Sequence, residues 1–158
     1  MRVDIRSSWL AAALFIPRAT AILALTLLVA ACDISSLIPI PQPPGQISGL
    51  VQIPQAPPEG LAVTVLAGVQ SDGMIRVKSD FVDVLVEPGA TSASFRLPGV
   101  APGTYSVFAW RNVNANDAVD RGDWFGKEDN VVVRGGQTTT GVIVTVSQYT
   151  GSPIRIGR

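Results

Sequence analysis

The sequence predicts an all-β protein in which about seven strands form two antiparallel sheets that pack face to face as a sandwich. From residue 46 onward, short runs rich in β-branched and aromatic residues recur, and Gly and Pro separate them. No part of this region repeats its apolar residues at the spacing of a helix. Because an isolated hairpin is only marginally stable in water, we expect the strands to bury their apolar faces between two sheets.

Each strand is predicted from its own apolar run between turn signals. The runs are 47–53, 61–67, 81–86, 92–97, 104–110, 130–133 and 139–146. A run at 74–78, after a turn at 71–73, is a candidate for one more strand.

The strongest predicted strand, at 104–110, has large side chains on both faces, although a sandwich core needs only one. Phe108 and Trp110 lie on the face that the core does not need. The strand is followed by a long predicted loop, from 112 to about 129. We expect this loop to fold back and lay Trp124 or Phe125 over Phe108 and Trp110.

The N-terminal segment has the pattern of a secretory signal peptide. Arg2, Arg6 and Arg18 make it positive, and the apolar run at 21–31 carries no charge. This run is shorter than the roughly 20 apolar residues that a transmembrane helix needs. The pattern therefore favours removal of residues 1–31 on export over a transmembrane anchor.

Cys32 follows this segment and is the single cysteine of the chain. The residues "VAAC" at 29–32 resemble the bacterial lipobox, in which an aliphatic residue and two small residues precede a cysteine. The resemblance implies cleavage before Cys32, lipid on its thiol and further acylation, for example by palmitate. Two acyl chains anchor a protein stably where one does not. The alternative is an ordinary cleaved signal with an incidental cysteine.

Residues 32–45 are predicted to be a Pro-rich tether between the lipidated cysteine and the folded body. Prolines stop helices and favour an extended polyproline-like chain, which is either a semi-rigid spacer or a tether without defined length. The prolines are Pro39, Pro41, Pro43 and Pro44. We expect the β-sandwich domain over 46–149 and a C-terminal tail over 150–158.

Three stretches resemble the prealbumin-like, or carboxypeptidase-regulatory-like, β-sandwich domains of bacterial envelope proteins. They are "ISGLV" at 47–51, "FRLPGVAPGTYSVFAW" at 95–110 and "GQTTTGVIVTV" at 136–146. The resemblance covers about 46–149 and implies an immunoglobulin-like or transthyretin-like sandwich. It specifies fold better than function. One transthyretin-related branch is a hydrolase that uses histidines, and this chain has no histidine.

The segment 112–123, "NVNANDAVDRGD", resembles the calcium loops of EF-hand and dockerin type. Such loops place oxygen ligands at positions 1, 3, 5, 9 and 12 and a backbone carbonyl at position 7. Counted in this way, the candidate calcium ligands are Asn112, Asn114, Asn116, Ala118, Asp120 and Asp123. Asp117 stands where a left-handed glycine is expected, and fewer charged ligands imply weak affinity, about 10⁻⁴ to 10⁻³ M. The alternative is a turn-rich loop whose Asn and Asp side chains bond their own backbone.

Composition argues against catalysis and against nucleic acid. Absence of histidine removes the commonest general base, and acylation removes the thiol of Cys32 as a nucleophile. The formal net charge is zero, so no basic excess is available to neutralise phosphates. We therefore expect no enzyme, but a non-catalytic, lipid-anchored cell-envelope protein whose sandwich serves in binding or structure.

Two alternatives remain open at this point. The first is a calcium-responsive adhesion or carbohydrate-contacting module that uses the 112–123 loop. The second is an accessory subunit of a larger envelope complex. The expected partners are the membrane, through the lipid on Cys32, and another envelope protein or a glycan. Calcium is the one cofactor considered, and no other metal is expected.

Overall fold

The structure is a computed structural model that describes residues 41–55 and 57–157. The predicted signal peptide, Cys32 and the first part of the predicted tether lie outside the described residues. Within the described ranges, no helix has the length and apolar character needed to cross a membrane.

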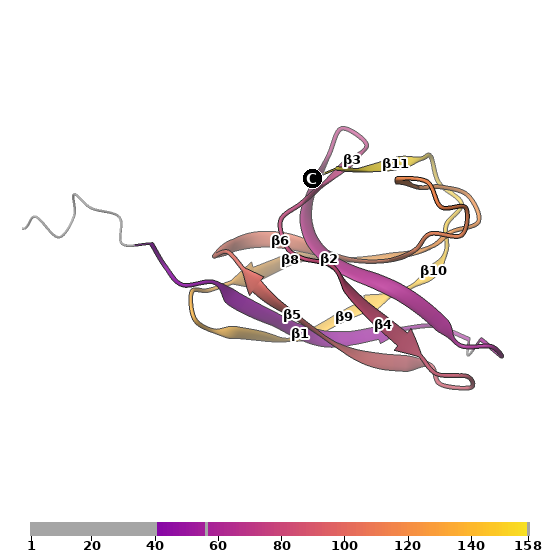
Figure 1. Ribbon diagram of the computed structural model, residues 1–158, viewed down its shortest axis with the longest axis horizontal. Helices are drawn as coiled ribbons and strands as arrows, with labels where there is room; N and C mark the ends of the chain where they lie inside the picture. The colour runs from indigo at the N-terminus through magenta and orange to yellow at the C-terminus, as the bar shows by residue number, and fades with distance from the viewer. Residues whose placement is uncertain (1–40, 56, 158) are drawn as a thin grey trace, which may run out of the picture. The chain divides into compact units, whose positions relative to one another are not determined.

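The described chain forms eleven strands (Figure 1). They are β1 (Gly45–Gln52), β2 (Leu61–Ser71), β3 (Met74–Val77), β4 (Val82–Val86), β5 (Ser92–Val100), β6 (Gly103–Arg111), β7 (Ala118–Val119), β8 (Trp124–Val133), β9 (Thr138–Thr145), β10 (Ser147–Gln148) and β11 (Ile154–Gly157).

The strands form two sheets, which confirms the predicted all-β sandwich. The smaller sheet has the order β5–β1–β9, and the larger has the order β10–β8–β6–β2–β3–β11–β7. β4 pairs with the first half of β2, and β3 pairs with its second half. The sheets are mixed rather than purely antiparallel, because β1 pairs with β9 and β3 with β11 in parallel. The strands outnumber the predicted seven mainly because β7, β10 and β11 have two to four residues each, too few for alternation to show.

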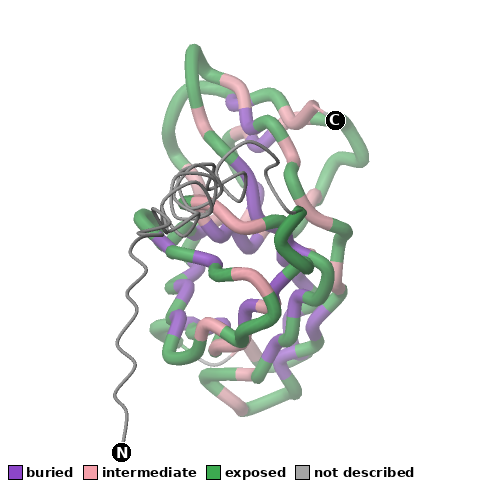
Figure 2. The backbone as a smooth tube through the Cα atoms, turned by 90° about the vertical axis from the view of Figure 1, so that its left-hand side faces the viewer, coloured by how far each residue is buried: buried purple, intermediate pink, exposed green. Residues whose placement is uncertain are grey.

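The main core lies between the two sheets and follows the predicted alternation. β2 directs Leu61, Val63 and Val65 inward, and β1 directs Ile47 and Val51 toward them from the other sheet. Figure 2 shows buried and exposed positions alternating along the strands, as the two-residue period of a strand requires. Each fully buried aliphatic side chain contributes roughly 1.5–3 kcal/mol relative to an exposed one.

A second apolar cluster lies on the opposite face of the larger sheet. Its buried members are Leu66, Ile75, Phe108, Val119 and Ile154. β2 and β6 are apolar on both faces in this region, so both faces must be covered. The larger sheet curls to do this, and β3, β11 and β7 return over the outer face of β2 and β6 (Figure 1).

The predicted contact between Phe108 and the residues after the loop is confirmed for Phe125. The two rings stack with centroids 6.0 Å apart, and Tyr149 meets Phe125 edge-on at 5.5 Å. Trp124 packs against the main core instead. Phe125 reaches Phe108 from the neighbouring strand β8, and the layer over Phe108 comes from β7 and β11.

Two predicted boundaries need correction. The loop after β6 does not extend to about residue 129, because β8 begins at Trp124 and pairs with β6. The predicted tail at 150–158 contains β11, which pairs with β3 and β7. Residues 127–129 are charged, and Phe125 and Ile154 pack in the second cluster, which is assembled from distant parts of the chain, so neither segment shows a local strand pattern.

The predicted Pro-Gly corner at 98–103 lies where the smaller sheet passes to the larger one, although β5 continues through 98–100 and only residues 101–102 lie between β5 and β6. The Tyr105 hydroxyl donates a hydrogen bond to the Ala101 carbonyl, at 3.0 Å. A tyrosine that bonds back to the backbone a few residues upstream is a known way of fixing such corners in sandwiches. The turn signal in the sequence therefore has the structural role that it predicted.

Strand register places the 112–123 loop far from the point where the described chain enters the sandwich. Gly45 at the start of β1 pairs with Val100, and Gly103 pairs with Val133, so these residues share one end. β6 and β8 meet at their other ends, where Arg111 pairs with the first residue of β8. The loop between them therefore projects from the opposite end.

Gly49 provides a test of the pairing in the smaller sheet. It lies in β1 between β5 and β9, and an added Cβ would overlap the Val142 carbonyl oxygen. We expect Gly49→Ala to lower the free energy of unfolding by about 1–3 kcal/mol, because a paired backbone cannot move aside cheaply. At Gly157 an added Cβ meets the Met74 sulfur at 3.5 Å, an ordinary contact, so Gly157→Ala should cost less than about 0.5 kcal/mol. Equal losses in urea unfolding would contradict the register between β1 and β9.

Candidate functional site

The 112–123 loop leaves β6, passes through the short strand β7 and returns as β8. Val119 in β7 is buried in the second cluster and fixes the middle of the loop to the body. The left-handed backbone positions of the loop are Ala115, with φ of 58°, and Gly122, with φ of 104°. The sequence comparison with calcium loops placed that conformation at Asp117, so the turn lies elsewhere in the structure.

Asp123 is the residue that holds the loop together. Its side chain is only 1% exposed, although it is charged. One carboxylate oxygen accepts from the Val113 backbone N–H at 2.8 Å. The other accepts from the Asp120 backbone N–H at 3.0 Å and from the Trp110 indole N–H at 3.2 Å. The buried charge is therefore compensated by three donors, as a buried carboxylate requires.

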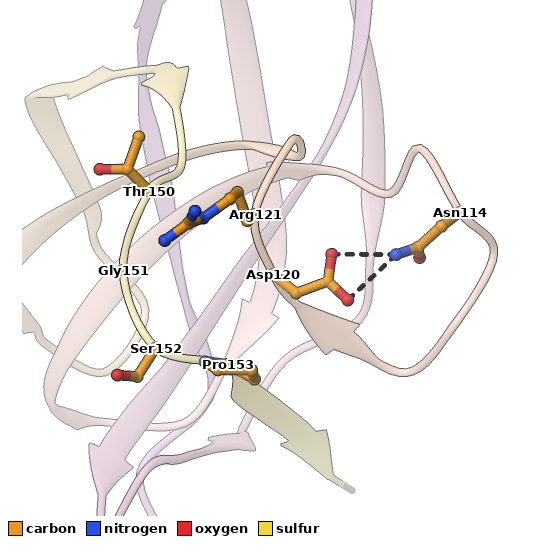
Figure 3. A pocket seen from close by; sticks show the side chains of 7 residues that line it. All are labelled: Asn114, Asp120, Arg121, Thr150, Gly151, Ser152 and Pro153. Atoms are coloured by element: carbon orange, nitrogen blue, oxygen red, sulfur yellow. Dashed lines mark hydrogen bonds between the residues drawn. The ribbon is translucent and has the colours of Figure 1, made fainter.

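Asp120 is the second centre of the loop and is partly exposed. The Asn114 amide donates to both of its carboxylate oxygens, at 2.9 and 3.0 Å (Figure 3). The Asn116 amide donates to one of them at 2.7 Å. Three of the six predicted ligand residues are thus brought together around Asp120.

The remaining polar groups of the loop follow the turn-forming pattern of asparagine. The Asn114 and Asn116 side-chain oxygens accept from backbone N–H groups two residues further on, at 3.3 and 2.9 Å. Asn112 donates to the Asn116 carbonyl. The Asn112 side-chain oxygen is buried and has no hydrogen-bond partner within the described part of the chain. These bonds are those expected of a loop that organises its own backbone.

The predicted calcium ligands can be compared with this geometry. Both oxygens of Asp123 and both oxygens of Asp120 already accept from N–H groups. Calcium takes carboxylate and carbonyl oxygens that are free to face it, so the arrangement described here does not fit the ion. No cluster of three His, Cys, Asp or Glu residues suited to a metal occurs in the described ranges.

A cleft of about 690 Å³ lies beside the loop (Figure 3). One wall is formed by Asn114, Asp120 and Arg121, and the other by residues 150–153 of the segment before β11. The sequence interpretation missed Arg121 and the 150–153 segment as site residues. The only signal for Arg121 was its charge next to Asp120, and nothing in the sequence indicated that the predicted tail returns to the loop.

An ion pair on β8 lies outside this cleft. Lys127 Nζ lies 2.9 Å from Asp129 Oδ2, and the Ser106 hydroxyl donates to Asp129 at 2.6 Å. The Ser106 hydrogen bond and the Lys127 ammonium hold the pKa of Asp129 below its usual value of 3.8. Both charged side chains are close to half exposed, so the pair contributes little to stability.

Comparison of the chain with family models, with curated proteins and with solved structures gave no match.

Proposed function

We propose that the chain is a lipid-anchored, non-catalytic protein of the bacterial cell envelope, and that its β-sandwich works as a binding module. The lipobox-like residues at 29–32 and the apolar run before them support the anchor at Cys32. The two-sheet scaffold supports the binding role, because a rigid sandwich commonly presents recognition loops at its ends. A prealbumin-like origin of the domain belongs to the same proposal.

The environment of Asp123 is the main support for a non-catalytic role. It is the buried charged side chain of the described residues, and a buried carboxylate is the usual starting point for acid–base chemistry. Its two oxygens accept from two backbone N–H groups and one indole N–H. The group is therefore used to position the loop, and the loop presents the cleft.

Replacement of the predicted lipidation residue tests the anchor. We expect Cys32→Ser to move the protein from the membrane fraction to the soluble fraction, or to leave an unprocessed precursor, because serine cannot form the thioether. Metabolic labelling with a palmitate analogue should mark the natural protein and not the variant. A variant that stays in the membrane fraction with its label would contradict the anchor at Cys32.

The calcium-responsive alternative is supported by the convergence of Asn114 and Asn116 on Asp120. It is opposed by Asp123, whose oxygens are occupied by N–H donors. We therefore expect millimolar calcium to leave the melting temperature of the protein unchanged, since a ligand must bind the folded state to raise it. A rise that disappears in Asp120→Asn and persists in Asp83→Asn would establish the calcium alternative instead.

A further inference from the structure

We propose that the cleft between the 112–123 loop and residues 150–153 binds a neutral saccharide. This inference rests on the proposed binding function and adds the position of the site and the class of ligand. It is argued from the walls of the cleft, from their polarity and from their charge.

Both walls of the cleft are held in place by hydrogen bonds that do not involve the cleft itself. The loop wall is fixed by Asp123, as described above. The opposite wall is fixed by Tyr149, whose hydroxyl donates to the Ser152 carbonyl at 2.7 Å. The two walls are tied to each other, because the Tyr149 N–H donates to the Asp123 carbonyl at 2.7 Å and the Gly122 N–H to the Tyr149 carbonyl at 3.2 Å. A ligand would therefore meet a site that is already formed.

The cleft is large enough for a small ligand but has the wrong lining for an apolar one. Its volume of about 690 Å³ would hold a small ligand, and it is largely open to solvent. Ligand pockets are usually lined mainly by hydrophobic and aromatic side chains, whereas here the side chains are polar or charged except for Pro153. The ligand must therefore bind through hydrogen bonds.

The polar groups of the cleft supply both donors and acceptors. The Arg121 guanidinium donates, and the Thr150 and Ser152 hydroxyls both donate and accept, while the Asp120 oxygens already accept from the Asn114 and Asn116 amides. The guanidinium and these two hydroxyls are exposed and make no hydrogen bond within the described residues. Figure 3 shows Arg121 extending toward the 150–152 segment, while Asp120 points the other way, toward Asn114. A sugar, whose hydroxyls each donate and accept, matches this alternation.

The charges of the cleft favour a neutral ligand. Asp120 and Arg121 are the charged residues of the lining, and they cancel. An anion would gain from Arg121 but would be repelled by Asp120, and a cation would meet the reverse. A neutral polyhydroxylated ligand accepts from Arg121 and exchanges hydrogen bonds with Thr150 and Ser152 without either penalty.

The position of the cleft suits recognition of something beyond the protein. The loop wall projects from the end of the sandwich opposite to Gly45, where the described chain enters. A ligand can thus reach the cleft without passing the tethered end of the domain.

The test uses the full chain in a detergent without a sugar headgroup, on an array of immobilised oligosaccharides that includes neutral members and their sulfated derivatives. We expect binding to at least one neutral oligosaccharide, and weaker binding to its sulfated derivative. Arg121→Ala should reduce the affinity for that oligosaccharide about tenfold or more, because a charge-assisted hydrogen bond is lost. The matched control is Arg76→Ala, which removes an equally exposed arginine from β3 and should leave the affinity unchanged.

Three results would overturn the proposal: no neutral oligosaccharide bound, tighter binding of the sulfated derivatives, or equal affinity in Arg121→Ala and the natural chain. Melting temperatures of both variants, expected to equal that of the natural chain, show that the fold is retained. If Arg121→Ala unfolds, Ser152→Ala takes its place, with Ser94→Ala on β5 as its control.

Failure of the saccharide proposal leaves the proposed anchor intact, since the Cys32→Ser fractionation does not depend on any saccharide. Loss of the anchor would equally leave binding in detergent unaffected.

Discussion

Asp123→Asn is expected to lower the free energy of unfolding by about 2–5 kcal/mol, because Asp123 is the buried charged residue of the described part of the chain. Asparagine has nearly the same shape as aspartate. In the natural protein the N–H donors face carboxylate oxygens, whereas in the variant some of them would face the NH2 group of the amide, which cannot accept a hydrogen bond. Because asparagine keeps one acceptor oxygen, the amide nitrogen deprives either the Val113 N–H, or the Asp120 N–H and the Trp110 indole N–H, of an acceptor in a buried position. Urea unfolding followed by tryptophan fluorescence measures the loss, and Trp110 reports directly on the site.

The matched control for this variant is Asp117→Asn. Asp117 lies in the same loop and carries the same charge, but it is exposed. Its replacement should change the free energy of unfolding by less than about 0.5 kcal/mol. If both variants unfold at the same urea concentration as the natural protein, Asp123 does not hold the loop, and the argument that its carboxylate is structural fails.

Leu66→Ala should cost about 2–5 kcal/mol, whereas Leu85→Ala should cost less than about 1 kcal/mol. Leu66 in β2 is fully buried in the second cluster, and Leu85 in the neighbouring strand β4 is 54% exposed. Without the curl of the larger sheet, Leu66 would lie on an open outer face, as Leu85 does. The difference between the losses of unfolding free energy in the two leucine variants therefore shows whether β7 and β11 cover β2.

Urea unfolding of the two leucine variants provides the comparison, since the linear extrapolation gives a free energy for each. A similar and small loss in both would show that the second cluster does not form. A similar and large loss of unfolding free energy in both variants would mean that Leu85 is buried, whereas the structure shows it exposed.

The main core could be predicted from the sequence because its signal is local. Leu61, Val63 and Val65 alternate along one strand, and the two-residue period alone places them on one face. The corner at 98–103 was also predictable, since Pro and Gly specify a turn by their own backbone preferences. The second cluster was not, because Leu66, Ile75, Val119 and Ile154 come from four separate segments, and one of them was read as a tail.

The sequence pattern drew attention to the 112–123 loop, and the structure shows which of its polar groups bond one another. The spacing of Asn and Asp residues singled out Asp120 and Asp123 as oxygen ligands, and both do collect polar groups. Their partners, however, are N–H groups of the protein, which residue spacing cannot distinguish from a metal ion. Arg121 and Ser152 line the same cleft because Tyr149 bonds to Asp123 and Gly122, a contact between segments about 25 residues apart.

The most direct test of the proposed anchor is the intact mass of the protein extracted from the membranes of the cells that naturally produce it. The account predicts a chain that begins at Cys32 and exceeds its polypeptide mass by a diacylglycerol group, with or without one further fatty acid. A chain that still begins at Met1, or one that begins near residue 32 at its bare polypeptide mass, would contradict the lipid anchor on which the proposed function depends.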